Sequence, residues 1–297
     1  MLFVMLLIVT FIAFTIIYFL PGSPLPFLSM RAEASGLTRA LGSLGLSGTF
    51  FGNFILFVVD ILMKLDSSAF AMTKPVALST FSVRVKYTLM LCLCAVVISW
   101  IVGLPLGIAA ATHRGKALDN ILTGLSVAFG SMPSFWVGLM LLLVFSGILN
   151  VIPVLFFGTK SMILPIVTLS ICNLPTVSGA VRAGIVDAMG KDFIVAARSK
   201  GLRERLVINR HAVRNAFLPL LSVLSSQLTK AFGGALVIER VFSVPGLGSL
   251  MFDSISSRDI FTVMVCLLIS ACISGVVSLL ADVIYTVVNP SLRQRYE

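Results

Sequence analysis

The sequence predicts an all-α, polytopic membrane protein with six transmembrane helices. Of its 297 residues, 58% are hydrophobic and 11% are charged, whereas soluble domains carry about 25% charged residues. The mean hydropathy of +1.07 agrees with a membrane protein. The formal net charge is +10, and the basic residues lie mostly in the gaps between apolar runs. This pattern indicates positive-inside topology and not nucleic-acid binding.

Six apolar stretches are long enough to cross a bilayer, which takes about 20 residues. The first carries no charge and lacks the basic start and small-residue cleavage site of a signal peptide, so we expect an uncleaved span. The third is interrupted by Pro133, a residue that membrane helices tolerate when neighbours satisfy the freed backbone groups. The six stretches are residues 2–20, 87–111, 121–148, 163–181, 217–238 and 260–288.

The segment between the first two spans is mixed in composition. Gly, Ser and Pro punctuate residues 21–49, and residues 50–63 are apolar except for Gly52, Asn53 and Asp60. Because this second stretch is short and carries an acid, we interpret it as an interfacial or partner-packing helix. The sequence therefore divides into a first helix with an external segment (1–86), a five-helix core (87–288) and a tail (289–297).

The loops predict the orientation. Residues 112–120, 182–215 and 289–297 are rich in Lys and Arg, whereas residues 21–86, 149–162 and 239–259 carry fewer basic residues, offset by acids. The basic set should be cytoplasmic. We therefore expect both termini, and the cytoplasmic loop at 182–215, on the inner side of the membrane.

Catalytic motifs are missing from the sequence. It contains no G-x-x-x-x-G-K-S/T phosphate-binding loop and no H-E-x-x-H metal motif. Its two histidines, His113 and His211, lie in predicted loops, and its five cysteines lie in apolar stretches. A membrane-embedded enzyme would need a histidine or paired acids within a span, so we expect no enzyme, no cofactor and no metal site.

The most basic part of the chain is residues 182–214, with eight Lys and Arg. Residues 185–200 have largely helix-forming composition, and Gly201 suits the left-handed position that ends a helix. A second short helix could follow at 204–217, with Pro219 opening the fifth span. We interpret this segment as a docking site for a soluble partner, in which small alanines allow close approach; a basic loop that fixes topology or contacts anionic lipid remains equally open. The candidate docking residues are Val195, Ala196, Ala197, Arg198, Lys200 and Gly201.

Lys230 lies inside the fifth span. A lysine near mid-bilayer costs on the order of 2.5–3.5 kcal/mol on insertion scales, and such residues usually face the bundle interior or water. We interpret Lys230 as a pore-lining charge that attracts an anionic group such as a peptide carboxylate, with Gln227 and Ser226 as weaker pore candidates. An interior ion pair and a snorkelling side chain are the alternatives.

A polar turn follows the fifth span. It contains Glu239 and Arg240 and then Pro245 and Gly246, a dipeptide that forms tight turns. We predict an outer gate or a contact with an external binding protein at these four residues. A structural turn with a local ion pair is the alternative.

Several motifs together resemble one family. The runs from Asp192 to Leu202 and from Arg210 to Pro219 look like the cytoplasmic EAA loop of ABC importer permeases of the peptide/nickel class, of the dipeptide and oligopeptide permease B type. Val195 stands where that family has an acidic or polar residue, and Asn289 replaces an acid at the end of the sixth span. Further matches are Leu20–Pro24 after the first span, Met132–Gly138, Ile163–Pro165, Glu239–Gly248, Arg258–Asp259 and Asn289–Pro290.

The resemblance implies a type I ABC importer permease fold and a set of partners. This chain would form half of a transmembrane pore with a second homologous permease, two ABC ATPase subunits and an external solute-binding protein in the inner membrane. The expected cargo is di- or oligopeptides, with nickel or a metal chelate as the alternative. A self-standing channel and an intramembrane enzyme are the other hypotheses, and neither needs the basic segment as a docking site.

Overall fold

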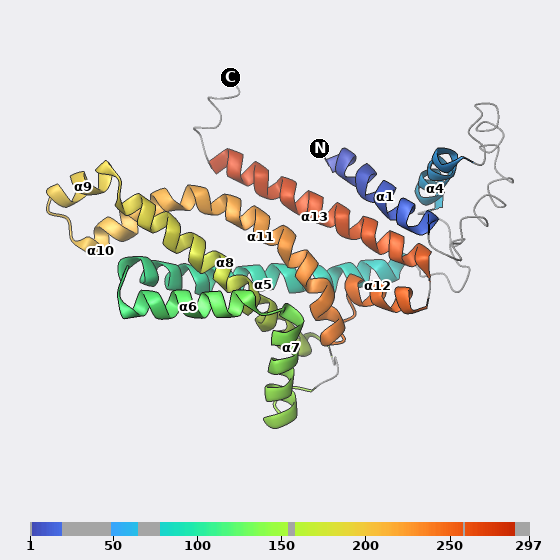
Figure 1. Ribbon diagram of the computed structural model, residues 1–297, viewed down its shortest axis with the longest axis horizontal. Coiled ribbons are helices and arrows are strands. Elements are labelled where there is room, and N and C mark those ends of the chain that lie inside the picture. The colour runs from blue at the N-terminus through green and yellow to red at the C-terminus, as the bar shows by residue number, and fades with distance from the viewer. Residues whose placement is uncertain (1, 20–48, 65–77, 154–157, 258, 289–297) are drawn as a thin grey trace, which may run out of the picture. The chain divides into compact units, whose positions relative to one another are not determined.

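The computed structural model describes residues 2–19, 49–64, 78–153, 158–257 and 259–288. Every regular element in these ranges is a helix (Figure 1), which confirms the all-α prediction. The motif at Leu20–Pro24, Arg258, and the tail at 289–297 with Asn289 lie outside the described residues.

The chain divides into two compact units. The first comprises residues 1–85 and 250–273, and the second comprises residues 86–249 and 274–297. In the first unit, α1 (Leu2–Tyr18) and α4 (Phe50–Lys64) pack through aromatic side chains. Phe14 is fully buried, and its ring lies 5.4 Å from those of Phe50 and Phe54. Residues 50–63, which we interpret from the sequence as an interfacial or partner-packing helix, are therefore helical, and α1 covers their aromatic face.

The second unit contains most of the long helices and the segments that join them. Two π-helical stretches interrupt it, η2 at Leu143–Ile148 and η4 at Val207–Ala212. Its remaining helices are α5 (Leu78–Thr112), α6 (Ala117–Ser131), α7 (Ser134–Leu142), η3 (Thr159–Met162), α8 (Ile163–Met189), α9 (Asp192–Ser199), α10 (Glu204–Leu206) and α11 (Val213–Val241). The chain continues through α12 (Leu247–Ser256) and α13 (Ile260–Val288).

The described helices confirm some but not all of the six predicted membrane spans. By length and composition, four described helices can span a bilayer: α5, α8, α11 and α13. A fifth span results if α6 and the helix from Ser134 to Ile148 are counted together, although the chain bends by 98° between them. The bend falls at Pro133, which precedes α7 in an extended conformation and cannot continue α6. The apolar part of α1, Val4–Ile16, is shorter than a typical span.

Two other boundaries differ from the sequence prediction. The helix-forming stretch 185–200 is split at Gly190, which ends α8, so that Lys191 starts a new helix, α9. The sequence predicts a separate short helix at 204–217, but no helix ends at residue 217. Instead, α10, η4 and α11 follow one another without a break. Pro219 consequently lies inside the continuous helix and does not open it.

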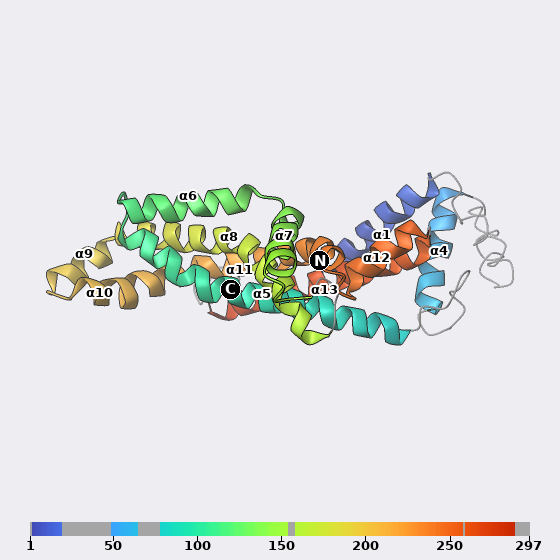
Figure 2. The same cartoon turned by 90° about the horizontal axis from the view of Figure 1, so that it is seen from below.

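Close helix contacts hold the second unit together. A Cβ added at Gly103 would lie 2.9 Å from the Cβ of Val177, and one at Gly107 would lie 2.6 Å from that of Val181. The two glycines are four residues apart, the spacing that lets membrane helices approach closely. In Figures 1 and 2, α8 and α11 run side by side, and α9 and α10 lie together at one end of them.

Candidate functional site

Helix α9, which carries most of the candidate docking residues, is attached to the long helices by a buried cluster. Ile194 is fully buried and Ala197 is 5% exposed, and both pack with apolar residues of α5, α8, η4 and α11. The cluster consists of Ala111, Val177, Val181, Ile185, Ala188, Ile194, Ala197, Val207, Ala212, Ala216 and Leu220. Because packed interiors transmit displacement, a force on α9 reaches three long helices through these contacts. Ala197 is therefore buried against the long helices, and its predicted contact with a partner stays a prediction.

The outer side of α9 is exposed and partly apolar. Val195 is 58% exposed, Phe193 is 37% exposed, and Ala196, Arg198 and Lys200 are also exposed. Beside α9 is a surface hollow of about 430 Å³, lined by residues that include Gly184, Asp192 and Asn215. The helix therefore presents small and apolar side chains together with two cations.

The C-terminal end of α9 has the geometry that the sequence predicted. Lys200 caps the helix, and Gly201 has a φ of 71°, in the left-handed region that glycine adopts without strain. No atom lies within 4 Å of a Cβ added at Gly201, so the space outside it is open. The prediction that Gly201 ends a helix in the left-handed conformation is confirmed, whereas its part in docking stays a prediction.

An ion pair joins α9 to α10. The Nη2 atom of Arg198 lies 2.5 Å from Oε1 of Glu204, and both side chains are about half exposed. The hydrogen bond from Arg198 lowers the pKa of the Glu204 carboxyl below its ordinary range. The pair therefore stabilises the folded state at pH values above the ordinary pKa range of a glutamate. This stabilisation is lost as the pH falls through the lowered pKa of Glu204.

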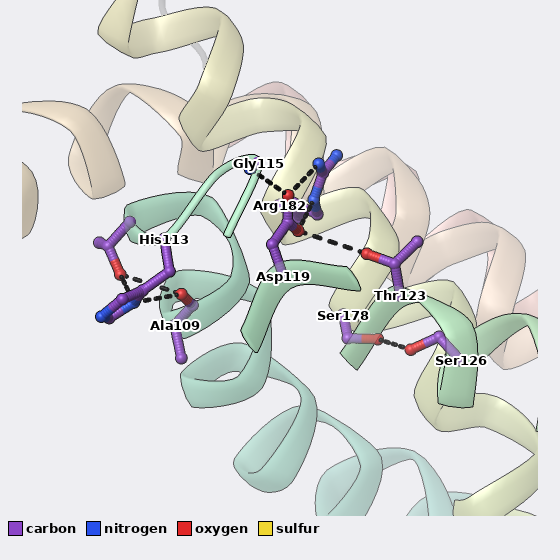
Figure 3. A network of polar contacts seen from close by, with 9 residues as sticks. Ala109, His113, Gly115, Asp119, Thr123, Ser126, Ser178 and Arg182 are labelled. Carbon is purple, nitrogen blue, oxygen red and sulfur yellow. Dashed lines mark hydrogen bonds and ion pairs between the residues drawn. The ribbon is translucent and has the colours of Figure 1, made fainter. Parts of the chain in front are cut away.

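A second ion pair, which the sequence did not point to, connects α6 and α8 (Figure 3). Asp119, in the first turn of α6, is 2% exposed. It accepts hydrogen bonds from Arg182 Nε at 2.5 Å and Arg182 Nη2 at 2.7 Å. Gly115 N–H and Thr123 Oγ1 donate to the same carboxylate. This bidentate pair lies two helical turns from the end of α8, close to where α9 begins.

Gln227 is buried, unlike the pore-lining side chain that the sequence predicted. Trp100 Nε1 donates to its side-chain oxygen at 2.6 Å, and its amide donates to the backbone oxygen of Asn173 at 3.0 Å. Its exposed fraction is 1%. Gln227 therefore links α5, α8 and α11 inside the bundle.

Ser226, Thr229, Lys230 and Gly233 are the exposed residues of this part of α11. Lys230 lies about 60° around the helix axis from Gln227, at the edge of the buried side. The Ser226 and Thr229 hydroxyls donate to backbone oxygens one turn earlier in the helix. Their oxygen atoms can still accept hydrogen bonds. The exposed side of α11 is thus polar over about two turns.

The turn after α11 is built around a buried carboxylate. Glu239 is fully buried and accepts hydrogen bonds from Thr88 Oγ1 at 2.6 Å and from Gly248 N–H at 2.7 Å. A Cβ added at Gly246 would overlap this carboxylate. Of the four residues predicted as an outer gate or binding-protein contact, Glu239 and Gly246 are enclosed, whereas Pro245 is half-buried and Arg240 is exposed.

Comparisons with known proteins agree with this architecture. Residues 103–294 match the model of the family described as binding-protein-dependent transport system inner membrane component. The chain is 32% identical over 292 residues to the glutathione transport system permease protein of Pectobacterium atrosepticum, covering 98% of this chain and 95% of that protein. It is 30% identical over 321 residues to the dipeptide transport system permease protein of Escherichia coli, covering 97% and 94%.

Solved structures show the same fold. The inward-facing MetNI methionine ABC transporter superposes with a TM-score of 0.59 at 16% identity, covering 71% of this chain and 97% of that one. An amino acid ABC transporter solved with histidines gives 0.54 at 19% identity, covering 74% and 94%. The match of the family model over most of the chain, and identities of 30% and above over nearly its full length, show that this protein belongs to the binding-protein-dependent transport system inner membrane components, a family of non-enzymatic ABC permease subunits.

Proposed function

We propose that this chain forms half of the pore of an ATP-driven peptide importer and that α9 is the docking helix for an ATPase subunit. In this proposal the chain works with a second permease, two ATPase subunits and an external solute-binding protein, and both its termini are cytoplasmic. The structure of α9 is the observation that carries the proposal.

The length of α8 supports a position of α9 outside the membrane. Its 27 residues extend about 40 Å, whereas the hydrocarbon core of a bilayer is about 30 Å thick. The end of α8 and the whole of α9 would then project into the cytoplasm. Exposed apolar side chains such as Val195 and Phe193 are favourable there when a protein partner covers them.

The sequence has no phosphate-binding loop, so the energy for transport would come from the partner. ATP binding would bring the two ATPase subunits together and displace α9. The buried cluster would carry that displacement to α5, α8 and α11. These helices would then move between inward-open and outward-open arrangements.

The cargo is inferred from the relatives. Both proteins named above are permeases of transport systems for short peptides, a dipeptide and glutathione. This favours peptides over the nickel or metal-chelate alternative. Among the described residues there is no group of three or more His, Cys, Asp or Glu that could hold a metal ion.

Replacing Gly201 with tryptophan tests the docking helix. We expect Gly201→Trp to abolish uptake and the co-purification of the ATPase subunits, while the permease stays in the membrane at its normal level. The added side chain meets no atom of this chain within 4 Å of its Cβ, so the loss would arise at the contact with a partner.

Gly115→Trp is the matched control. Gly115 also has a positive φ, 76°, and open space around its Cβ, and it lies in the loop between α5 and α6. Both variants therefore carry the same backbone strain. Equal loss of uptake in the two, or unchanged uptake with Gly201→Trp, would contradict the docking role of α9.

A further inference from the structure

The exposed side of α11 differs from the exposed sides of the other long helices. On α5, Leu93, Val97 and Ile101 are between 46% and 66% exposed, as expected for a surface that contacts lipid. No large hydrophobic side chain is exposed in the described part of α11. Between its ends its exposed residues are instead serine, threonine, lysine and glycine, and Arg214, Asn215 and Arg240 are exposed near its ends. Such a surface suits water or polypeptide better than lipid tails.

Lys230 lies on this surface and in the middle of the apolar stretch. The candidate span on α11 runs from Leu220 to Val241, so that each end is about 15 Å from Lys230 along the helix axis. A lysine side chain extends about 6 Å, and an average tilt of about 20° shortens the axial distance only slightly. Lys230 therefore cannot place its ammonium group in the headgroup region of either leaflet.

The packing of the other side of α11 fixes the orientation of Lys230. Gln227 is held by Trp100 and by the backbone of Asn173, and Ala231 and Ala235 are fully buried. A rotation that buried Lys230 would break both hydrogen bonds of Gln227. Within the described residues, Lys230 has no hydrogen bond and no ion pair. An ammonium group at this depth requires water or a counter-charge.

We propose that Lys230 binds the carboxylate of the transported peptide at the midpoint of the pathway. The proposal rests on the proposed function, because it requires the exposed side of α11 to line the pore. Ser226 lies about one turn before Lys230, Thr229 directly precedes Lys230, and both are exposed. Their hydroxyl oxygens can accept hydrogen bonds from peptide N–H groups. The surface thus offers a cation for the carboxylate and acceptors for the remainder of a short peptide.

Chemical protection of a cysteine beside Lys230 tests this site without the binding protein. In the solubilised permease–ATPase complex, with the five natural cysteines replaced, Ser226→Cys is alkylated with a small, water-soluble maleimide. We expect a dipeptide to slow this alkylation and the C-terminal amide of the same dipeptide to have no effect. Adding Lys230→Met should remove the protection, and Lys230→Arg should retain it.

Equal protection by the dipeptide and its amide, or protection that persists with Lys230→Met, would overturn the carboxylate site while leaving the pore intact. A Ser226→Cys side chain that does not react at all would overturn the site as well, because it would show that this side of α11 is not in water, and would count against the pore proposal. The permease–ATPase complex could also fall apart in Lys230→Met but not in a Lys116→Met control. That result would point to an acid of the second permease as the partner of Lys230, and it would refute the proposed carboxylate site.

Transport provides an independent readout. In proteoliposomes with all subunits, Lys230→Met should lower peptide uptake about tenfold or more, since a charge-assisted hydrogen bond is lost. The ATPase activity stimulated by the loaded binding protein should remain, and Lys230→Arg should restore uptake. Loss of the stimulated ATPase activity together with uptake would refute a role confined to cargo binding.

Discussion

The carboxylate of Glu239 joins the end of α11 to the start of α12. It accepts hydrogen bonds from the N–H groups of Gly248 and Ser249, which lie in the first turn of α12 and have no partner within the helix. Thr88 donates to the same carboxylate and accepts from Leu247 N–H at 2.9 Å. One acid and one hydroxyl therefore satisfy three backbone donors in a buried turn.

We expect Thr88→Val to destabilise the protein by about 1–3 kcal/mol. The substitution keeps the shape of the side chain but leaves Leu247 N–H buried without a partner, and it removes one donor from Glu239. Thermal unfolding of the purified protein measures the effect. Thr112→Val is the control, because that hydroxyl bonds only within its own turn and to His113. A midpoint equal to that of the control would contradict the role of Thr88.

At the scale of elements, the crossing of α5 and α8 depends on the two glycines of α5. At Gly107, any side chain would meet both Val181 and the backbone oxygen of Ser178, so the two helices would have to separate. The same two helices carry the cluster that holds α9. The spacing of α5 and α8 therefore determines where α9, the proposed docking helix, is placed.

Gly107→Leu should disrupt this crossing, at a cost of about 1–3 kcal/mol or more for overpacking. Gly179→Leu on α8 is the matched control, since no atom lies within 4 Å of a Cβ at that position. Size-exclusion chromatography of fluorescent fusions in detergent compares the two. We expect the monodisperse peak to be lost for Gly107→Leu alone; its retention would show that the crossing tolerates a larger spacing.

Local signals in the sequence predicted some of these elements and not others. Gly201 was recognised because a left-handed helix end favours glycine, and Pro133 because it interrupts a long apolar run. The break at Gly190 and the uninterrupted passage from α10 through Pro219 depend on packing around the cluster, which composition does not reveal. Likewise, Gln227 is as polar as a pore residue, and only its contact with Trp100 identifies it as a link between helices.

At the scale of the whole molecule, the charge distribution predicts on which side of the membrane each loop lies. Lys116 follows α5 in a loop that we expect to be cytoplasmic, and Ser256 ends α12 in a segment that we expect to be external. Both side chains are exposed. Topology can therefore be measured at two positions that belong to neither the docking helix nor the exposed side of α11.

With the natural cysteines replaced, Lys116→Cys should react with a membrane-impermeant maleimide only in inside-out vesicles, and Ser256→Cys only in intact cells or right-side-out vesicles. This outcome follows from the excess of Lys and Arg in the loops on the cytoplasmic side. Reaction of Lys116→Cys from the outside would invert the topology and place α9 out of reach of any ATPase.

The Asp119–Arg182 pair has a consequence for the order of biosynthesis. The two residues are 63 positions apart, so that α6 leaves the ribosome well before Arg182 does. Until then, the carboxylate can remain charged only if it stays in water at the membrane boundary, because an unpaired charge is costly in lipid. Asp119 lies in the segment 112–120 that we expect to be cytoplasmic, where water can solvate the carboxylate until Arg182 has been made. The bond between α6 and α8 is therefore one of the later contacts that the growing chain can form.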